Sequence, residues 1–163
     1  MSASLAMHGT TVGSIYVVRD VVMIVVLGSG VPDEELTRAL ALASRNGEGR
    51  CAILVVIRPE SPLPSPELAG ILRKMLRPRA DLAGIVVSVG STGFAAGFFL
   101  SFANRVLDYI GLDAPTKITR GLEPAIDFLS RIGLRGAGSR GMEREIVNAL
   151  DDFELTQTRA LSA

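Results

Sequence analysis

The chain has 163 residues, of which 48% are hydrophobic, enough for one folded domain with a full core, which excludes global disorder. Its 17 basic and 17 acidic residues cancel, so the strongly basic surface of a general nucleic-acid binder is not expected. A single cysteine, Cys51, excludes an internal disulfide, and a single histidine, His8, leaves no His/Cys cluster for a structural zinc ion.

The domain is predicted to begin with a β-hairpin. Residues 1–13 lack the basic and long apolar segments of a secretory signal, and we interpret them as a flexible leader. Two β-branched runs follow, over residues 14–18 and 21–27. The two residues between them, Arg19 and Asp20, suit the tight turn of a hairpin.

Helices and strands are predicted to alternate after the hairpin. Pro32, followed by three acidic residues, is typical of a helix start, and Asn46-Gly47 is typical of a helix end. Residues 51–57 form a short continuous apolar run, as expected of a strand covered on both faces. The remaining elements predicted from spacing are a helix starting at Ser65, a strand over 84–89, a helix over 94–110, a strand over 115–119 and a helix over 123–132.

This order predicts an α/β fold over residues 14–132. An initial hairpin and alternating strand–helix units give a mixed sheet covered by about four helices. Residues 133–141 contain four glycines and are predicted to be a flexible linker. Residues 142–163 are predicted to hold a C-terminal helix and a tail, and apolar side chains lie on one face of the helix over 142–153. This segment either docks on the domain or binds a partner.

One segment has the length of a membrane span. Residues 82–104 carry no formal charge over 23 positions. Serine, glycine and threonine interrupt them between residues 88 and 93, with a β-branched run before and a Phe-rich run after. A strand, a turn and a buried helix explain this pattern better than one membrane helix. We therefore expect a soluble cytoplasmic protein.

The element order, the helix after Pro32 and the Ala-Ile-Asp-Phe-Leu helix at residues 125–129 together resemble a STAS-type domain. STAS domains are found in sulfate transporters and in anti-sigma factor antagonists. The resemblance covers about residues 14–132 and is closest to small stand-alone bacterial STAS-like proteins, which begin with a short hairpin. It implies a regulatory protein–protein interaction module.

The resemblance makes Ser65 a candidate phosphorylation site. Antagonists of the family carry an Asp-Ser-x-Gly motif with a phosphorylatable serine, and the equivalent place here is Pro64-Ser65-Pro66-Glu67, without the flanking Asp and Gly. A serine before a proline is also well suited to cap a helix, which stabilises it by about 1 kcal/mol. Glu67 would repel a phosphate at that helix end. The sequence leaves capping and phosphorylation open.

A turn between a predicted strand and helix could hold an anion. Backbone N–H groups in Gly90-Ser91-Thr92-Gly93 resemble those of phosphate-binding loops, which makes Ser91, Thr92 and Gly93 candidate anion-binding residues. The Walker lysine is absent and the G-x-G-x-x-G spacing is not met. Capping by Ser or Thr explains the same residues, so both interpretations stay open.

No catalytic arrangement is predicted. A serine nucleophile needs a base, and the only histidine lies in the leader. Nothing in the spacing points to the two lysines, Lys74 and Lys117, as a base. Arg73, Lys74, Arg77 and Arg79 gather at the end of the second predicted helix, where cations complement the helix dipole. We expect no enzyme activity, no cofactor and no bound metal.

The helix predicted over residues 94–110 is apolar on two flanks. One flank suits a sheet beneath it and holds Phe99, Ala103, Leu107 and Ile110. The other holds Phe94, Phe98, Phe102 and Tyr109. Neighbouring helices or the C-terminal segment cover this second flank, or else it is an interface, because large exposed apolar patches mark binding sites.

The function expected from these features is that of a non-enzymatic interaction module of STAS type. It would self-associate or bind a regulatory protein through Phe94, Phe98, Phe102 and Tyr109, and would not bind nucleic acid. The alternative is a binder of an apolar ligand or a membrane lipid that uses the same helix.

Overall fold

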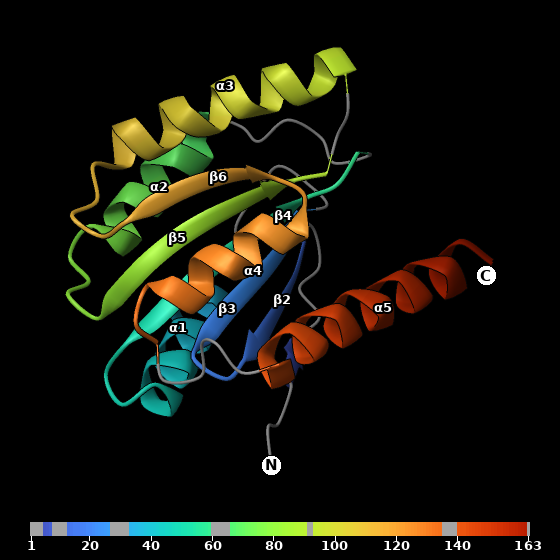
Figure 1. Ribbon diagram of the computed structural model, residues 1–163, viewed down its shortest axis with the longest axis horizontal. Coiled ribbons are helices and arrows are strands. Elements are labelled where there is room, and N and C mark those ends of the chain that lie inside the picture. Colours follow the sequence, from blue (N-terminus) through green and yellow to red (C-terminus); the bar gives the residue numbers. More distant parts are fainter. Residues whose placement is uncertain are drawn as a thin grey trace.

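The computed structural model describes residues 5–7, 13–26, 33–59, 66–90, 93–134 and 140–162 (Figure 1). The strands are β1 (Leu5–Met7), β2 (Gly13–Val18), β3 (Val21–Val26), β4 (Cys51–Ile57), β5 (Leu82–Val89) and β6 (Thr116–Arg120). The helices are α1 (Asp33–Asn46), α2 (Pro66–Leu76), α3 (Gly93–Ile110), α4 (Leu122–Arg131) and α5 (Arg140–Ser162).

The strands form one sheet in the order β1-β2-β3-β4-β5-β6. Strand β2 is antiparallel to both of its neighbours, β1 and β3, and β3 to β6 run parallel. The predicted fold class is confirmed: the chain is α/β, with an N-terminal hairpin of β2 and β3, a mixed sheet, and a helix at the C-terminal end. The hairpin turns at Arg19 and Asp20 as expected, with Val18 paired to Val21.

The sequential strand order places three helices on the same face of the sheet. Parallel strands are joined by right-handed crossovers, and crossovers that always step in one direction leave their helices on one side. Helices α1, α2 and α3 therefore cover the face that carries Val22, Ile53 and Ile85 (the first face). After β6 the chain folds back, and α4 and α5 cover the other side (the second face; Figure 1).

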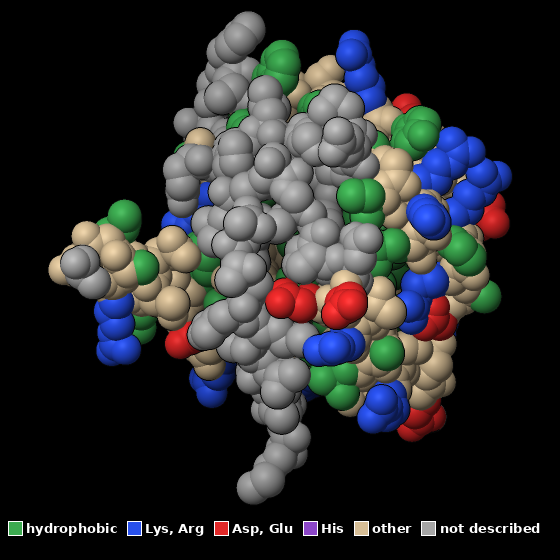
Figure 2. All heavy atoms as spheres, turned by 180° about the vertical axis from the view of Figure 1, so that it is seen from behind, with side chains coloured by type: hydrophobic (Ala, Val, Ile, Leu, Met, Phe, Trp, Pro, Cys, Tyr) green, Lys and Arg blue, Asp and Glu red, His purple; other side chains and the backbone are tan. Residues whose placement is uncertain are grey.

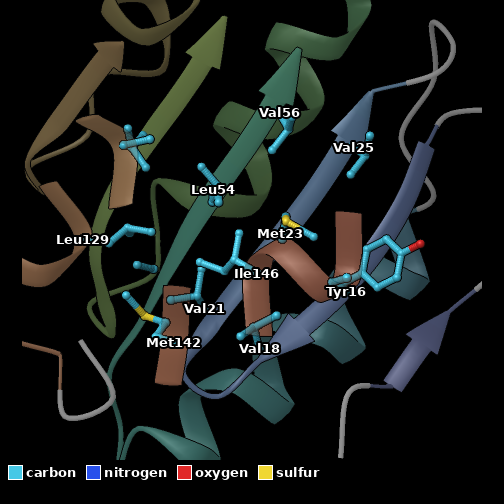
Figure 3. Packing of buried hydrophobic residues seen from close by; sticks show 14 of the residues in the cluster. Tyr16, Val18, Val21, Met23, Val25, Leu54, Val56, Leu129, Met142 and Ile146 are labelled. Atoms are coloured by element: carbon cyan, nitrogen blue, oxygen red, sulfur yellow. The ribbon is translucent and has the colours of Figure 1, made fainter. Parts of the chain in front are cut away.

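The core of the second face depends on α5. Met142 and Ile146 of α5 are fully buried and lie against Val21 and Leu54 of the central strands (Figure 3). Ala149 and Phe153 continue the same row, because positions four, seven and eleven residues after Met142 return to one side of a helix. The C-terminal helix predicted at 142–153 is thus docked on the domain.

Two parts of the chain differ from the sequence-based expectation. Leu5–Met7, inside the predicted flexible leader, form a strand that pairs antiparallel with β2. This three-residue strand forms because it pairs with β2 of the hairpin, so no local sequence pattern predicts it. At the other end, α5 continues to Ser162, where a tail was expected after Phe153. No Pro or Gly follows Gly141 to end the helix.

The expected linker is only partly described. Residues 135–139 lie outside the described residues, but Leu134 before them is buried in the core of the second face. Arg140 and Gly141 already belong to α5. Among the helices that the structure describes, none has both the length and the apolar character needed to cross a membrane.

Candidate interaction surface

Helix α3 lies on the first face of the sheet, against β5 and β6. Its residues Phe99 and Ala103 are buried against Val87 and Val89 of β5. Ile110 is buried as well, and Leu107 is partly buried. The flank predicted to face the sheet therefore does so, at the helical spacing that the sequence shows.

The second apolar flank of α3 stays open at its two described ends. Phe98 and Tyr109 each expose 53% of their surface, and Phe102 between them is partly buried. We call Phe98, Phe102 and Tyr109 the aromatic side of α3. The side chain of Phe94, the fourth aromatic residue predicted there, lies outside the described residues. Single exposed apolar residues are common, but exposed apolar residues that gather on one surface mark binding sites.

Helix α5 does not cover the aromatic side. It packs in the core of the second face, whereas α3 packs on the first face, so the sheet separates them. The neighbour of α3 is α2, whose Arg73 guanidinium lies 4.9 Å from the centre of the Tyr109 ring. A cation over an aromatic face is a favourable contact of about 0.5–1 kcal/mol at exposed sites. It orients Tyr109 while leaving half of that residue exposed.

The end of α2 next to the aromatic side is basic. Arg73, Lys74 and Arg77 line a shallow hollow together with Gly70 and Pro78. Lys74 and Arg77 are exposed, as is Arg105 of α3, while Asp108 is an exposed acid on the same helix. Lys and Arg side chains gather along the right-hand edge in Figure 2, on the side of α2. The candidate surface thus combines exposed aromatic rings with adjoining positive charge.

Arg79, the fourth cation of the predicted cluster, is engaged elsewhere. Its Nη2 and Nε atoms donate to the two carboxylate oxygens of Asp81 at 2.7 and 3.0 Å. These hydrogen bonds lower the pKa of the Asp81 carboxyl and raise that of Arg79. A bidentate pair of this kind holds the turn before β5, and leaves Arg73, Lys74 and Arg77 as the cations of the hollow.

Several predicted site residues cannot be placed. The candidate phosphorylation site Ser65 lies outside the described residues. The same holds for Ser91 and Thr92 of the candidate anion-binding turn. Gly93, the third candidate anion-binding residue, is the first residue of α3. The two lysines are placed: Lys74 is exposed on α2 and Lys117 is exposed on β6.

Two kinds of chemistry-bearing group can be placed in the described part of the chain: metal ligands and the cysteine thiol. No cluster of three or more His, Cys, Asp or Glu side chains with metal-binding geometry occurs among the described residues. Cys51 is fully buried, and burial raises the pKa of its thiol to about 11, with the Asp81 carboxylate adding to the effect. The thiolate that a nucleophile requires is therefore disfavoured at neutral pH.

Sequence reasoning left open that residues 142–163 bind a partner, but it did not identify the exposed apolar side chains of α5. Val147 and Leu155 expose 40% and 61% of their surface, and Leu161 near the end exposes 87%. Figure 1 shows the C-terminal half of α5 extending past the sheet that supports its first half. The signal available in the sequence was the unbroken run without Pro or Gly after Gly141.

No protein-family model matches the chain, and neither the curated proteins nor the solved structures contain a significant match.

Proposed function

We propose that this protein is a non-enzymatic interaction module that self-associates through the aromatic side of α3. The observation that carries the proposal is the exposure of Phe98 and Tyr109 in a helix whose other apolar flank already serves the core. Burying one large apolar side chain on association contributes about 1.5–3 kcal/mol when burial is complete. Aromatic residues beside arginine are also the residue types most enriched at interface centres.

The STAS-type assignment is part of this proposal. It is supported by the order of the elements, a hairpin followed by strand–helix units, and by the helix at residues 125–129. A regulatory role and a regulatory protein as a further partner follow from the resemblance, and a cytoplasmic location is proposed from the leader and from the interrupted apolar segment at residues 82–104. The balanced charge of the chain supports the absence of a nucleic-acid partner.

The absence of enzyme activity and of a cofactor is likewise proposed. It is supported by the buried, protonated thiol of Cys51 and by the position of both lysines on open surface. This part of the proposal would be overturned if the protein converted a substrate and lost that activity when Ser91 or Thr92 is replaced by Ala. Such a result would leave the interaction surface on α3 untouched.

Self-association is tested by size-exclusion chromatography with light scattering over a roughly hundredfold range of concentration. We expect a mass above that of the 17.2 kDa monomer, increasing with concentration. Phe98→Asp should abolish the increase with the fold intact, because Phe98 is half exposed and not part of the core. Asn104→Asp, at an exposed position elsewhere on α3, adds the same charge and should leave association unchanged.

A second candidate function is binding to an anionic lipid surface. It is favoured by the position of Arg73, Lys74 and Arg77 beside exposed aromatic rings, a combination typical of interfacial membrane binding. Co-sedimentation with liposomes that contain an anionic lipid separates the two. Two results would favour the lipid surface over self-association. The protein should sediment with anionic but not with neutral liposomes, and Phe98→Asp should abolish this sedimentation. The protein should also be strictly monomeric in solution.

A further inference from the structure

We infer that the copies associate head to tail: the solvent-facing side of α5 of one copy docks on the aromatic side of α3 and the basic end of α2 of the next. This inference rests on the proposed self-association and specifies its second surface. The surface that binds α3 is then α5 of a second copy of the protein. The alternative, α3 against α3 about a twofold axis, uses one surface twice.

The docking side of α5 is a row of three residues. Val147, Asp151 and Leu155 are spaced by four and point away from the row that packs on the sheet, which ends at Phe153. Val147 is 40% and Leu155 is 61% exposed, and Asp151 between them is exposed as well. We call these three residues the α5 stripe. It is apolar at both ends and acidic at its centre.

The receiving surface on α3 also has apolar residues at its ends, but the residue at its centre carries the opposite charge. Phe98 and Arg105 are seven residues apart on α3, and Tyr109 follows four residues later, so all three lie on one side of the helix. All are exposed, and the middle one is a cation. At about 1.5 Å per residue, this row spans about 16 Å and the α5 stripe about 12 Å, so the two can overlap along most of their lengths.

The surrounding charges favour the same pairing. Arg73, Lys74 and Arg77 adjoin the receiving surface on the side of α2. The exposed Asp152 flanks the α5 stripe on one side, whereas Glu154 on the other side is ion-paired with Arg58, with 2.9 Å between Oε1 and Nη2. Complementary charge attracts the two surfaces, whereas an α3-to-α3 contact with parallel helices would bring the basic ends of both α2 helices together. Like charges facing each other across an interface destabilise it.

The two surfaces cannot meet within one molecule, because they lie on opposite faces of the sheet. Helix α3 packs on the first face and α5 on the second (Figure 1). A contact between them must therefore join different copies, and it leaves one surface of each kind unoccupied at the two ends of a dimer. Such a contact continues into a ring or a filament instead of stopping at two copies.

The test mixes two variants that each lack one surface. Phe98→Asp removes the receiving surface and keeps the α5 stripe, and Leu155→Asp does the reverse. Each replaced side chain is more than half exposed, so both variants should fold, which circular dichroism and thermal unfolding check. Matched controls are Asn104→Asp on α3 and Leu161→Asp on α5, both exposed and outside the two rows.

We expect each variant alone to be monomeric at concentrations where the unchanged protein and both controls associate. An equal mixture of the variants should form a 1:1 complex with twice the monomer mass, which does not grow further because each surface is then used once. Reversing charges gives an independent readout. Arg105→Glu and Asp151→Lys should each weaken association at least several-fold, and the chain that carries both should recover most of it.

Other outcomes overturn the inference in distinguishable ways. If Phe98→Asp is monomeric but Leu155→Asp associates like the unchanged protein, α5 is not the partner, and the proposed function stands. If both variants are monomeric and their mixture is too, the contact is not head to tail. If the unchanged protein is monomeric at every concentration, the proposed self-association fails together with the inference.

Discussion

Arg19, in the turn between β2 and β3, forms an ion pair with Glu145 of α5, with 3.1 Å between Nη2 and Oε1. The Nε atom of Arg19 lies 3.3 Å from each oxygen of the same carboxylate. The two residues are 126 positions apart in the sequence. Their contact ties the docked half of α5 to the hairpin, so it helps to decide which face of the sheet α5 covers.

The backbone conformation of Arg19 leads to a prediction about the stability of this turn. Its φ of 57° lies in the left-handed region, which costs about 1 kcal/mol or more for residues other than glycine. Each side chain of the ion pair is 30% exposed, so the pair contributes about 1 kcal/mol or less. Arg19→Ala should therefore lower the free energy of unfolding by up to about 1 kcal/mol. Arg19→Gly loses the same ion pair but relieves the backbone, and should unfold in urea close to the unchanged protein. A glycine variant less stable than the alanine variant would contradict this account.

Two glycines should respond in opposite directions to the same substitution. A Cβ at Gly84 of β5 would lie 3.0 Å from both Ile132 Cδ1 and Pro115 O, where the sheet meets the end of α4. Gly84→Ala should destabilise the protein by about 1–3 kcal/mol. At Gly97 of α3 nothing lies within 4 Å, so Gly97→Ala should stabilise it by about 0.5–1 kcal/mol through helix propensity. Chemical denaturation of both variants measures the contrast, and equal effects would disprove the packing argument.

The thiol of Cys51 should make stability depend on pH in the alkaline range. Burial and the nearby Asp81 carboxylate raise its pKa from 9.0 to about 11 in the folded protein. The unfolded chain therefore loses its thiol proton at lower pH than the folded one, and the folded state is destabilised as the pH rises from about 9 to about 11. Cys51→Ala should remove this part of the pH dependence, although it lowers stability at neutral pH by leaving a small void.

The measurement is the thermal midpoint of both proteins across that range. Tyr16, whose pKa burial also raises, is present in both, so only the difference between them reports Cys51. A thiol reagent gives a second readout: the folded protein should react slowly at neutral pH and the unfolded chain rapidly, because the sulfur is fully buried. Parallel pH curves for the two proteins would show that the thiol does not contribute.

The two halves of α5 should differ in their effect on stability. Ile146 is fully buried in the core of the second face, and Ile146→Ala should cost about 2–5 kcal/mol. Removing residues 156–163 should cost less than about 0.5 kcal/mol, because Gln157 alone among the described residues of that stretch is partly covered. This shortened chain keeps the α5 stripe and should associate like the full chain. A large loss of stability on shortening would show that the last turns of α5 support the fold.

Much of the fold is predictable from the sequence, because the informative patterns are local. The continuous apolar run at 51–57 predicted β4 with its exact bounds, since a strand buried on both faces has no polar position. The two β-branched runs around Arg19 and Asp20 predicted the hairpin. The spacing of Phe99 and Ala103 predicted which flank of α3 faces the sheet. Each of these follows from residues within a few turns or one strand of each other.

Which apolar surfaces stay exposed to solvent follows only from the three-dimensional arrangement of the helices. The sequence shows that α3 has a second apolar flank and that a C-terminal helix exists, but not whether one covers the other. That depends on the right-handed crossovers, which place α3 on the first face, and on the burial of Met142 and Ile146, which holds α5 on the second with the help of the ion pair of Arg19 with Glu145. Whether one helix covers the apolar surface of another depends on segments far apart in the chain, whereas the spacing of apolar residues depends only on neighbouring positions. For the same reason the strand at Leu5–Met7 becomes visible only beside its partner β2.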